Sequence, residues 1–226
     1  MSANAKKPLG RVALKRIKTK EEILAAALDI LSEQGVEGLT LAAVAEQLGF
    51  TKPALYHYFR SKEALIRSLV LELVHQESLE LIEAVSRTDG RNTVLGSLIR
   101  AFYQRYRNRL HAFRLVYCQF QLLDMQALGF DQDTLRQDVN PLSHRLFDIV
   151  MSILSENGNY PPTPALRQLA FSAWLAALGL VEMLSISDAA NDPLRHSDEA
   201  LLTTLESVFN AAVERMSESD PDDSVL

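Results

Sequence analysis

The sequence predicts an all-α fold of about nine helices, divided between a small N-terminal domain and a larger C-terminal one. Apolar residues recur three and four positions apart along most of the 226 residues, which is the spacing of one helix face. Threonine, serine and glycine stand where these runs begin and end, as helix caps do. No segment shows the alternation of a half-buried strand, and no unit of about 20–50 residues repeats.

The composition is that of one or two globular domains, with 47% hydrophobic and 23% charged residues. A single Cys cannot form an internal disulfide. The basic start MSANAKKPLG leads into no apolar stretch, so we expect no signal peptide and a cytoplasmic protein. Residues 1–67 carry 11 Lys and Arg against 7 Asp and Glu, whereas the rest carries 12 against 22. A basic front on an acidic protein predicts a polyanionic partner.

The first helix is predicted to begin at Thr19, because Thr19 and Glu22 have the spacing of a capping box. Apolar residues at helical spacing follow, and Gly35 ends the run. A second helix is predicted over 41–48, with Thr40 as its N-cap.

Gly49 ends the second helix and suits the left-handed residue of a tight turn. Thr51 then caps a short third helix, with Pro53 in its first turn, where a missing amide proton costs little. Ser61 caps a fourth helix. The turn between the second and third helices is therefore short and well defined.

Two short helices joined by a glycine turn and packed on a longer helix form a helix-turn-helix, which places its last helix in the major groove of DNA. On that helix Leu55 and Phe59 lie four residues apart and are predicted to point inward. The other side chains include a lysine, two tyrosines and a histidine, which suit phosphates and base edges. They are Lys52, Pro53, Ala54, Tyr56, His57 and Tyr58.

The stretch from Thr40 to Leu65, TLAAVAEQLGFTKPALYHYFRSKEAL, resembles the DNA-binding domain of the tetracycline-repressor (TetR) family. The resemblance covers roughly residues 15–67. It is specific because the glycine, the Leu-Tyr-His-Tyr-Phe core and the Ser-Lys-Glu cap all stand at fixed positions. Phe50 stands where the family usually has a small aliphatic residue, which predicts altered packing under the turn.

The resemblance implies that Lys52, Pro53 and Ala54 face base edges, with Lys52 the best candidate for a direct contact to guanine. It implies phosphate contacts for another group of side chains, with His57 touching a base or a phosphate. This group is Thr40, Thr51, Tyr56, Tyr58 and Lys62. Each of these roles has an alternative. The threonines could serve only as helix caps, Tyr58 could be partly buried in the core, and Lys62 could be merely solvated.

Residues 1–18 are assigned to a basic, flexible arm and residues 19–67 to the helix-turn-helix domain. The first 20 residues contain seven Lys and Arg and no acid. We expect residues 6–18 to follow phosphates or to enter an adjacent minor groove, as homeodomain arms do. A solubilising tail is the alternative.

Residues 68–217 are predicted to form a helical ligand-binding and dimerisation domain, and the acidic residues 218–226 a disordered tail. Asn140-Pro141 should kink or split one of its helices. The apolar segment 169–186 contains Glu182 and falls short of about 20 clean apolar residues, so we expect a buried helix and no membrane partner. The helical segments are placed near 62–86, 91–107, 110–128, 132–156, 164–187 and 197–217.

The resemblance also implies a homodimer in which the last two helices of each chain form a four-helix interface. The last helix supports this expectation, because its apolar face is wider than one monomer core needs. A two-fold dimer predicts a palindromic DNA site. The predicted interface residues are Ala170, Ala173, Ala177, Leu201, Leu205, Val208, Phe209 and Ala212.

An effector pocket is expected between the DNA-binding head and the dimer helices, and an apolar or aromatic small molecule is the default ligand. His144 and Asp148 lie four residues apart, but two ligands without a third do not make a metal site, so no metal and no cofactor are predicted. The predicted pocket residues are Phe102, Tyr106, His111, Phe113, Tyr117, Phe120, Gln121, His144, Phe147 and Trp174.

These features predict a transcriptional regulator that binds double-stranded DNA as a homodimer, represses transcription and is released by a small-molecule effector. A ligand-independent architectural DNA-binding protein and an adaptor that does not bind DNA remain alternatives. An all-helical enzyme is the rival from another class. The sequence contains no nucleophile elbow, His-Glu-x-x-His motif or glycine-rich phosphate loop, so no enzymatic activity is predicted.

Overall fold

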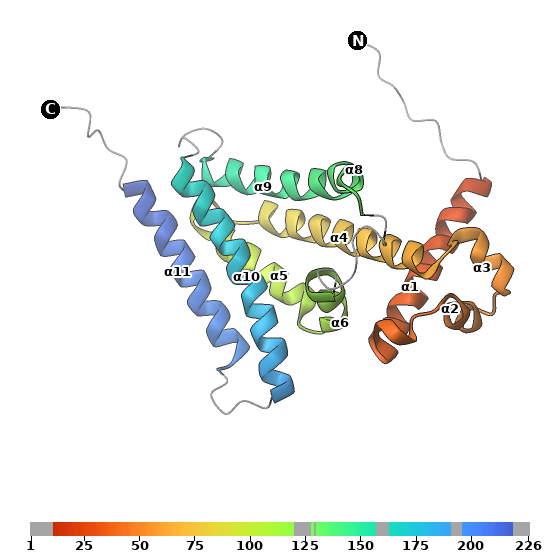
Figure 1. The fold of residues 1–226 in the computed structure, drawn as a ribbon. Coiled ribbons are helices and arrows are strands. Elements are labelled where there is room, and N and C mark those ends of the chain that lie inside the picture. The colour runs from red at the N-terminus through yellow and green to blue at the C-terminus, as the bar shows by residue number, and fades with distance from the viewer. Residues whose placement is uncertain (1–10, 120–127, 129, 157–162, 191–195, 219–226) are drawn as a thin grey trace, which may run out of the picture. The chain divides into compact units, whose positions relative to one another are not determined.

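The computed structural model describes residues 11–119, 128, 130–156, 163–190 and 196–218, and within these ranges it contains helices and no strand (Figure 1). The all-α prediction is therefore confirmed. The chain forms two compact units. Unit 1 comprises Met1–Glu72 and Arg114–Asp131, and unit 2 comprises Leu73–Phe113 and Gln132–Leu226. The sequence did not indicate that a segment beyond residue 113 belongs with the N-terminal unit.

Helix α1 (Arg11–Gly38) begins eight residues before the expected start at Thr19. Residues 11–34 contain no Gly or Pro and are rich in Lys, Arg, Leu and Ala, so nothing in the backbone requires a new start at Thr19. The helical path breaks at Gly35, whose φ of 69° lies in the left-handed region. Thus residues 11–18 are helical, and only residues 1–10 of the predicted arm lie outside the described residues.

Helix α2 (Leu41–Leu48) has the expected bounds, and α3 (Lys52–Tyr58) begins as expected after Thr51 and ends at its C-cap Phe59. Gly49 ends α2 with a φ of 66°, and the amides of Gly49 and Phe50 donate to the carbonyls of Glu46 and Ala45. This pair of bonds is a Schellman motif, which satisfies the last carbonyls of the helix and turns the chain sharply into α3.

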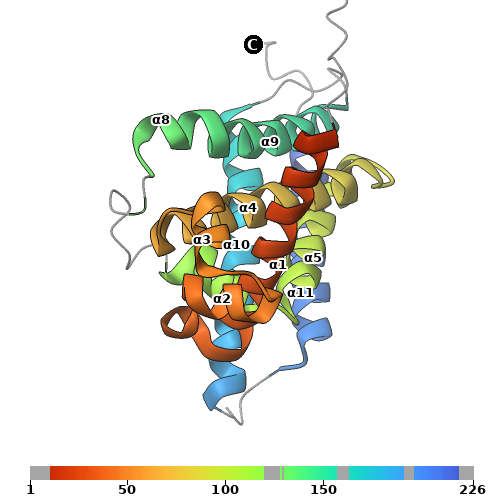
Figure 2. The ribbon, with the colours of Figure 1, turned by 90° about the vertical axis from the view of Figure 1, so that its right-hand side faces the viewer.

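Figure 2 draws the backbones of α1, α2, α3 and α4 (Lys62–Ser86). Apolar side chains from α1, α2, α3 and the start of α4 form the core of unit 1. Each of these helices contributes fully buried side chains, for example Ile23 of α1, Val44 of α2, Leu55 of α3 and Leu65 of α4. These are the positions at which the apolar residues recur at helical spacing, so burial of one face of each helix explains the packing.

Unit 2 is assembled around α5 (Val94–Tyr106), which packs against three later helices. These are α9 (Asn140–Leu154), α10 (Pro164–Ala190) and α11 (Asp198–Glu218). α10 and α11 lie side by side (Figure 1). The shorter pieces of the chain are η1 (Arg91–Thr93), α6 (Leu110–Phe113), η2 (Arg114–Gln119), α8 (Gln132–Thr134) and η3 (Leu135–Val139).

The helical pattern changes at Asn140-Pro141, where a kink or split was predicted. A π-helical turn, η3, directly precedes α9, which begins at Asn140 with Pro141 in its first turn. Proline has no amide proton to donate to the preceding turn and its ring crowds that turn, so the helix widens before it.

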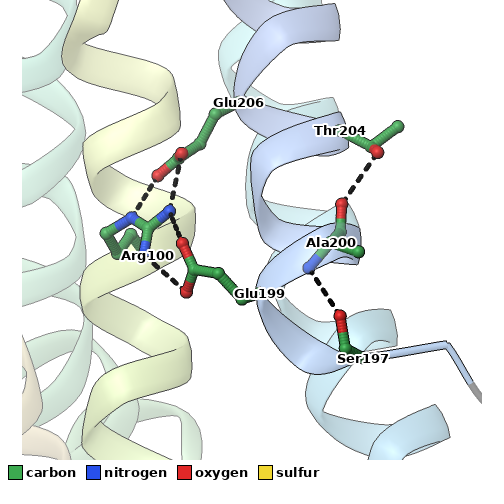
Figure 3. A network of polar contacts seen from close by, with 6 residues as sticks. All are labelled: Arg100, Ser197, Glu199, Ala200, Thr204 and Glu206. Carbon is green, nitrogen blue, oxygen red and sulfur yellow. Dashed lines mark hydrogen bonds and ion pairs between the residues drawn. The ribbon is translucent and has the colours of Figure 1, made fainter.

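An ion-pair network connects α5 to α11 (Figure 3). Arg100 donates to both carboxylate oxygens of Glu199, at 3.1 and 2.9 Å, and to Glu206, at 2.5 and 2.8 Å. Hydrogen bonds to Glu206 and then to Glu199 raise the pKa of the guanidinium. Gly96 permits the close approach, since an added Cβ would lie 3.1 Å from Glu206 Cγ.

The predicted interface residues divide into two groups in the structure. Ala170, Ala173 and Ala177 are at most 2% exposed, so the chain's own helices cover them and they are not available to a partner. Phe209 is 8% exposed and is also buried. Small and apolar residues at helical spacing pack equally well inside a monomer, which is how these four are covered here. Val208 is 57% exposed, and Leu201, Leu205 and Ala212 are half-buried.

Candidate nucleic-acid interface and cavity

Helix α3 is held in unit 1 by one side and exposes the other. Leu55 is completely buried and Phe59, at its C-cap, is 3% exposed, as their spacing predicted. The opposite side presents a lysine, a histidine and a tyrosine that is 52% exposed. We call this surface the exposed face of α3, and it consists of Lys52, Pro53, Ala54, Tyr56 and His57.

Both predicted threonine caps are formed. Thr40 Oγ1 accepts a hydrogen bond of 3.0 Å from the amide of Ala43, and Thr51 Oγ1 accepts one of 3.4 Å from the amide of Ala54. Both threonines are exposed, so each hydroxyl proton remains able to meet an acceptor such as a phosphate oxygen. Capping and an external contact are therefore compatible at these positions.

Tyr58 is half-buried, and its ring meets that of His57 edge to face at a centroid distance of 5.9 Å. Lys62 is also half-buried, and its Nζ donates a hydrogen bond of 2.7 Å to the carbonyl of Val36. This bond connects α4 to the segment after Gly35, a role that the sequence did not reveal. An ammonium has three donors, so two remain for another acceptor.

The first turns of α1 carry an exposed basic surface. Lys15, Arg16 and Lys18 are all exposed, and the Nζ of Lys20 lies 5.8 Å from the centroid of the Phe59 ring. That last contact is a cation–π interaction that joins α1 to the C-cap of α3. The basic residues expected in a flexible arm are thus carried, from residue 11 onward, by a helix.

A cavity of about 340 Å³ lies within unit 2 among α5, α9 and α10. Leu98 of α5 and Ala170 of α10 are buried in its wall. Phe171 and Trp174 complete the α10 side. The largest contribution comes from one face of α9, which supplies Ser143, His144, Leu146, Phe147 and Val150.

The structure brings three of the predicted pocket residues together, namely His144, Phe147 and Trp174. Phe102, Tyr106 and Phe113 are at most 1% exposed and form an aromatic cluster of the core. His111 and Tyr117 are half-buried and do not contribute to the described lining, and Tyr117 belongs to unit 1. Phe120 and Gln121 lie outside the described residues.

Several lining residues were not predicted from the sequence. The four positions 143, 146, 147 and 150 of α9 recur at helical spacing, which was a usable signal for one common face. Ala170 gave a different signal, because the alanines of its helix pointed to an interface, and Phe171 was not singled out from the sequence. Only the packing of three helices shows which of these faces encloses a space.

The described part of the chain contains no cluster of three or more His, Cys, Asp or Glu suitable for a metal.

One helical stretch in the same part of the chain, Pro164–Leu184, is long and apolar enough by composition to cross a membrane, with a mean hydropathy of 1.3. Its exposed apolar side chains are Phe171, Leu175 and Met183, and Ile186 follows them along the same helix.

The family model described as bacterial regulatory proteins, tetR family, matches residues 23–69. Tetracycline repressor protein class A from transposon 1721 of Escherichia coli is 38% identical over 95 residues, which are 40% of this chain and 43% of that protein. The chain thus matches less than half the length of that repressor. The nucleoid occlusion factor SlmA of Vibrio cholerae is 29% identical over 147 residues, 63% of this chain and 69% of that protein.

Solved structures resemble the chain over a much greater length. A protein of unknown function from Rhodococcus sp. RHA1 has a TM-score of 0.67 at 19% identity, with coverage of 85% of this chain and 94% of that one. The transcriptional regulator FadR from Bacillus subtilis, in complex with stearoyl-CoA, has a TM-score of 0.63 at 16% identity, with coverage of 84% and 97%. At such identities the likeness shows a shared fold.

Proposed function

Because the chain belongs to the TetR family of DNA-binding transcriptional regulators, we propose that it binds a palindromic operator as a homodimer, represses transcription there and is released by a small-molecule effector. The observation that carries the proposal is the exposed face of α3. A short helix anchored by Leu55 and Phe59 and presenting Lys52 and Tyr56 to solvent is suited to a major groove.

In the proposed complex, Lys52 donates to the O6 and N7 acceptors of guanine, while Pro53 and Ala54 contact neighbouring base edges. Tyr56 and Tyr58 donate to phosphates, and His57 contacts a base or a phosphate. The further phosphate contacts are Thr40, Thr51 and Lys62. Exposure supports these assignments, because all of these residues are exposed except Tyr58 and Lys62, which are half-buried.

The basic start of α1 extends this surface along the DNA in the proposal. Lys15, Arg16 and Lys18 neutralise phosphates next to the groove that α3 enters, and residues before Arg11 reach further along the duplex. The exposure of the three described side chains supports this role. Because each neutralised phosphate releases counterions, the arm contributes to affinity in a salt-dependent way.

The proposed dimer forms through the exposed apolar face shared by α10 and α11. Large apolar side chains that are each more than half exposed support this assignment, since a monomer gains nothing from leaving them in water. They are Phe171, Leu175, Met183, Ile186 and Val208. Half-buried Leu201, Leu205 and Ala212 complete the face. Association would cover the apolar side of α10, which accounts for its composition in a cytoplasmic protein.

Release by the effector is proposed to act through α4. Inside unit 2, Trp174 of the cavity wall contacts Phe102 at a centroid distance of 5.0 Å, and Phe102 contacts Tyr106 at 5.0 Å. The Tyr106 hydroxyl donates to the carboxylate of Glu77 on α4. An effector that moves Trp174 would thereby shift α4 and change the spacing of the two recognition helices.

Selection of bound duplexes from a random DNA pool tests the proposal, followed by transcription in vitro from a promoter that carries the selected sequence. We expect a palindromic sequence, and less transcript when the protein is added. A selected sequence without two-fold symmetry would overturn the dimeric operator. An increase in transcript would show that the protein activates transcription and would overturn the proposed repression.

One alternative is an architectural DNA-binding protein that needs no ligand, and the 29% identity to a nucleoid occlusion factor gives it only weak support. The cavity supports the effector-controlled regulator instead, because an apolar concave space of about 340 Å³ is typical of a small-molecule site. Thermal unfolding against small-molecule collections separates the two, since a ligand that binds the folded state raises the melting temperature.

A further inference from the structure

The described lining of the unit 2 cavity carries no Lys, Arg, Asp or Glu. Its inner wall consists of Leu98, Leu146, Val150 and Ala170, each at most 8% exposed. An ionised group transferred from water to such a wall would lose its hydration and gain no partner in exchange. The chemistry of the inner wall therefore selects a ligand whose enclosed part is uncharged.

The size of the cavity limits the ligand further. A volume of about 340 Å³ holds roughly a dozen groups of the size of a water molecule or a methylene, at about 30 Å³ each. Benzene is known to fill an engineered apolar cavity of about 150 Å³. A space of this volume thus accommodates two fused rings.

The shape of the lining favours an aromatic ring with one polar end. Trp174 is held by an edge-to-face contact with Phe102, at an interplanar angle of 72°, and it lines the cavity together with Phe147. Aromatic walls prefer offset or edge-to-face contact with another ring. The polar side chains of the described lining, Ser143 and His144, are neighbours on α9 and both are exposed, so they stand where the cavity meets solvent.

From these observations we infer that the cavity binds a compact, uncharged, two-ring aromatic molecule whose single hydroxyl or carbonyl group faces Ser143 and His144. The inference rests on the proposed function and deepens it, because it names the chemical class of the effector. It also sets this chain apart from the FadR structure that contains stearoyl-CoA. A whole acyl-CoA does not fit inside a space of about 340 Å³, and the described lining offers no cation for its phosphates.

Trp174 is the chain's single tryptophan, so its fluorescence reports on this cavity alone. We propose titrating the full chain with tetrahydronaphthol, with tetrahydronaphthoate as the matched anion, and with stearoyl-CoA. The expected result is a saturable change in emission with the alcohol and no saturable change with stearoyl-CoA. Binding of the carboxylate should be about tenfold weaker or worse, because it gives up part of its hydration and the described lining has no Lys or Arg to pair with it. Equal binding of alcohol and carboxylate would overturn the inference.

A variant pair connects the signal to the cavity. Val150→Phe fills the space from the buried wall, and binding of tetrahydronaphthol should fall about tenfold or more while the variant stays folded, because an added ring occupies an empty volume. Leu79→Phe adds the same ring to an exposed position of α4 outside the described lining and should bind as the parent does. Undiminished binding by Val150→Phe, with circular dichroism equal to that of the parent, would place the ligand elsewhere.

Measuring operator affinity in the same samples separates this inference from the proposed function. Binding of tetrahydronaphthol in the cavity without any loss of operator affinity would support the ligand class and refute release by an effector. Release of DNA by an anionic compound that leaves Trp174 emission unchanged would support an effector-controlled regulator and refute the assignment of ligand class to this cavity.

Discussion

Lys52 is the first residue of α3, directly after the N-cap Thr51, and its side chain is exposed. The helix start fixes where this side chain emerges, because the hydroxyl of Thr51 accepts from the amide of Ala54. The long lysine side chain can extend to a base, while the capped helix fixes the position of its Cα atom. This combination is what contact with a particular base requires.

Replacement of Lys52 by alanine is expected to cost roughly 1–3 kcal/mol at the selected operator and to relax the preference at one base position. The physical reason is the loss of hydrogen bonds to base acceptors, which other sequences do not offer in the same place. Fluorescence anisotropy with the operator and with random duplexes measures both effects. An equal loss on random DNA would make Lys52 a phosphate contact.

Local residue chemistry was predictable where the determinant lies within a few residues. The caps at Thr40 and Thr51 and the turn at Gly49 follow from side chains that bind the neighbouring backbone. Lys62 was not predictable in this way. Its bond to Val36 spans 26 positions and depends on how two helices meet.

At the scale of elements, polar contacts around Arg100 connect α5 to α11. The two glutamates that bind Arg100 differ in their exposure to solvent. The Glu206 side chain is 23% exposed and that of Glu199 is 70% exposed. Hydrogen bonding to Arg100 lowers the pKa of the Glu199 carboxyl below its usual 4.5. The two glutamates thus offer a comparison within one network.

Glu206→Gln is expected to lower the free energy of unfolding by roughly 1–2 kcal/mol, and Glu199→Gln by less, because solvent screens the more exposed pair. Urea unfolding at a fixed protein concentration measures both. Since its pKa is lowered on folding, the Glu199 contribution is present above pH 4.5 and is lost as the pH falls through the lowered value. A Glu199→Gln effect that grows in acid would contradict this interpretation.

The N-terminal part of α1 is an element whose role is testable by deletion. Removal of residues 1–16 should weaken DNA binding for all sequences and flatten the dependence of log K on log salt, by roughly 0.9 for each phosphate that is no longer neutralised. Affinities measured over a range of potassium chloride concentrations give this slope. Replacement of Lys15 and Arg16 by glutamine is the milder control, and an unchanged slope in both variants would reduce the segment to a solubilising tail.

The bounds of the elements were well predicted where capping residues and breakers mark them. α2, α3, the start of α9 at Asn140-Pro141 and α11 lie at or within a residue of their expected places. The start of α1 was not predictable from Thr19, because a capping pattern inside a run of strong helix formers does not force a start. The burial of the alanine face of α10 inside the monomer was not predictable either, since apolar periodicity does not tell a core from an interface.

At the scale of the whole molecule, the proposed dimer makes a prediction about association. Val208→Glu places a charge on the exposed apolar face of α11, where Val208 is 57% exposed, and should convert the dimer to a monomer. Sedimentation velocity measures the change. Thr203→Glu, at an exposed position on another side of the same helix, is the matched control. An unaltered profile for Val208→Glu would refute this interface.

Operator binding by the proposed dimer requires two copies of α3 to enter successive major grooves on one side of a duplex. The most direct measurement compares the selected operator with one in which about half a helical turn, roughly 5 base pairs, is inserted between the half-sites. We expect affinity for the lengthened operator to fall to that for random DNA, because the second groove then faces away. Equal affinity for both duplexes would contradict this mode of binding.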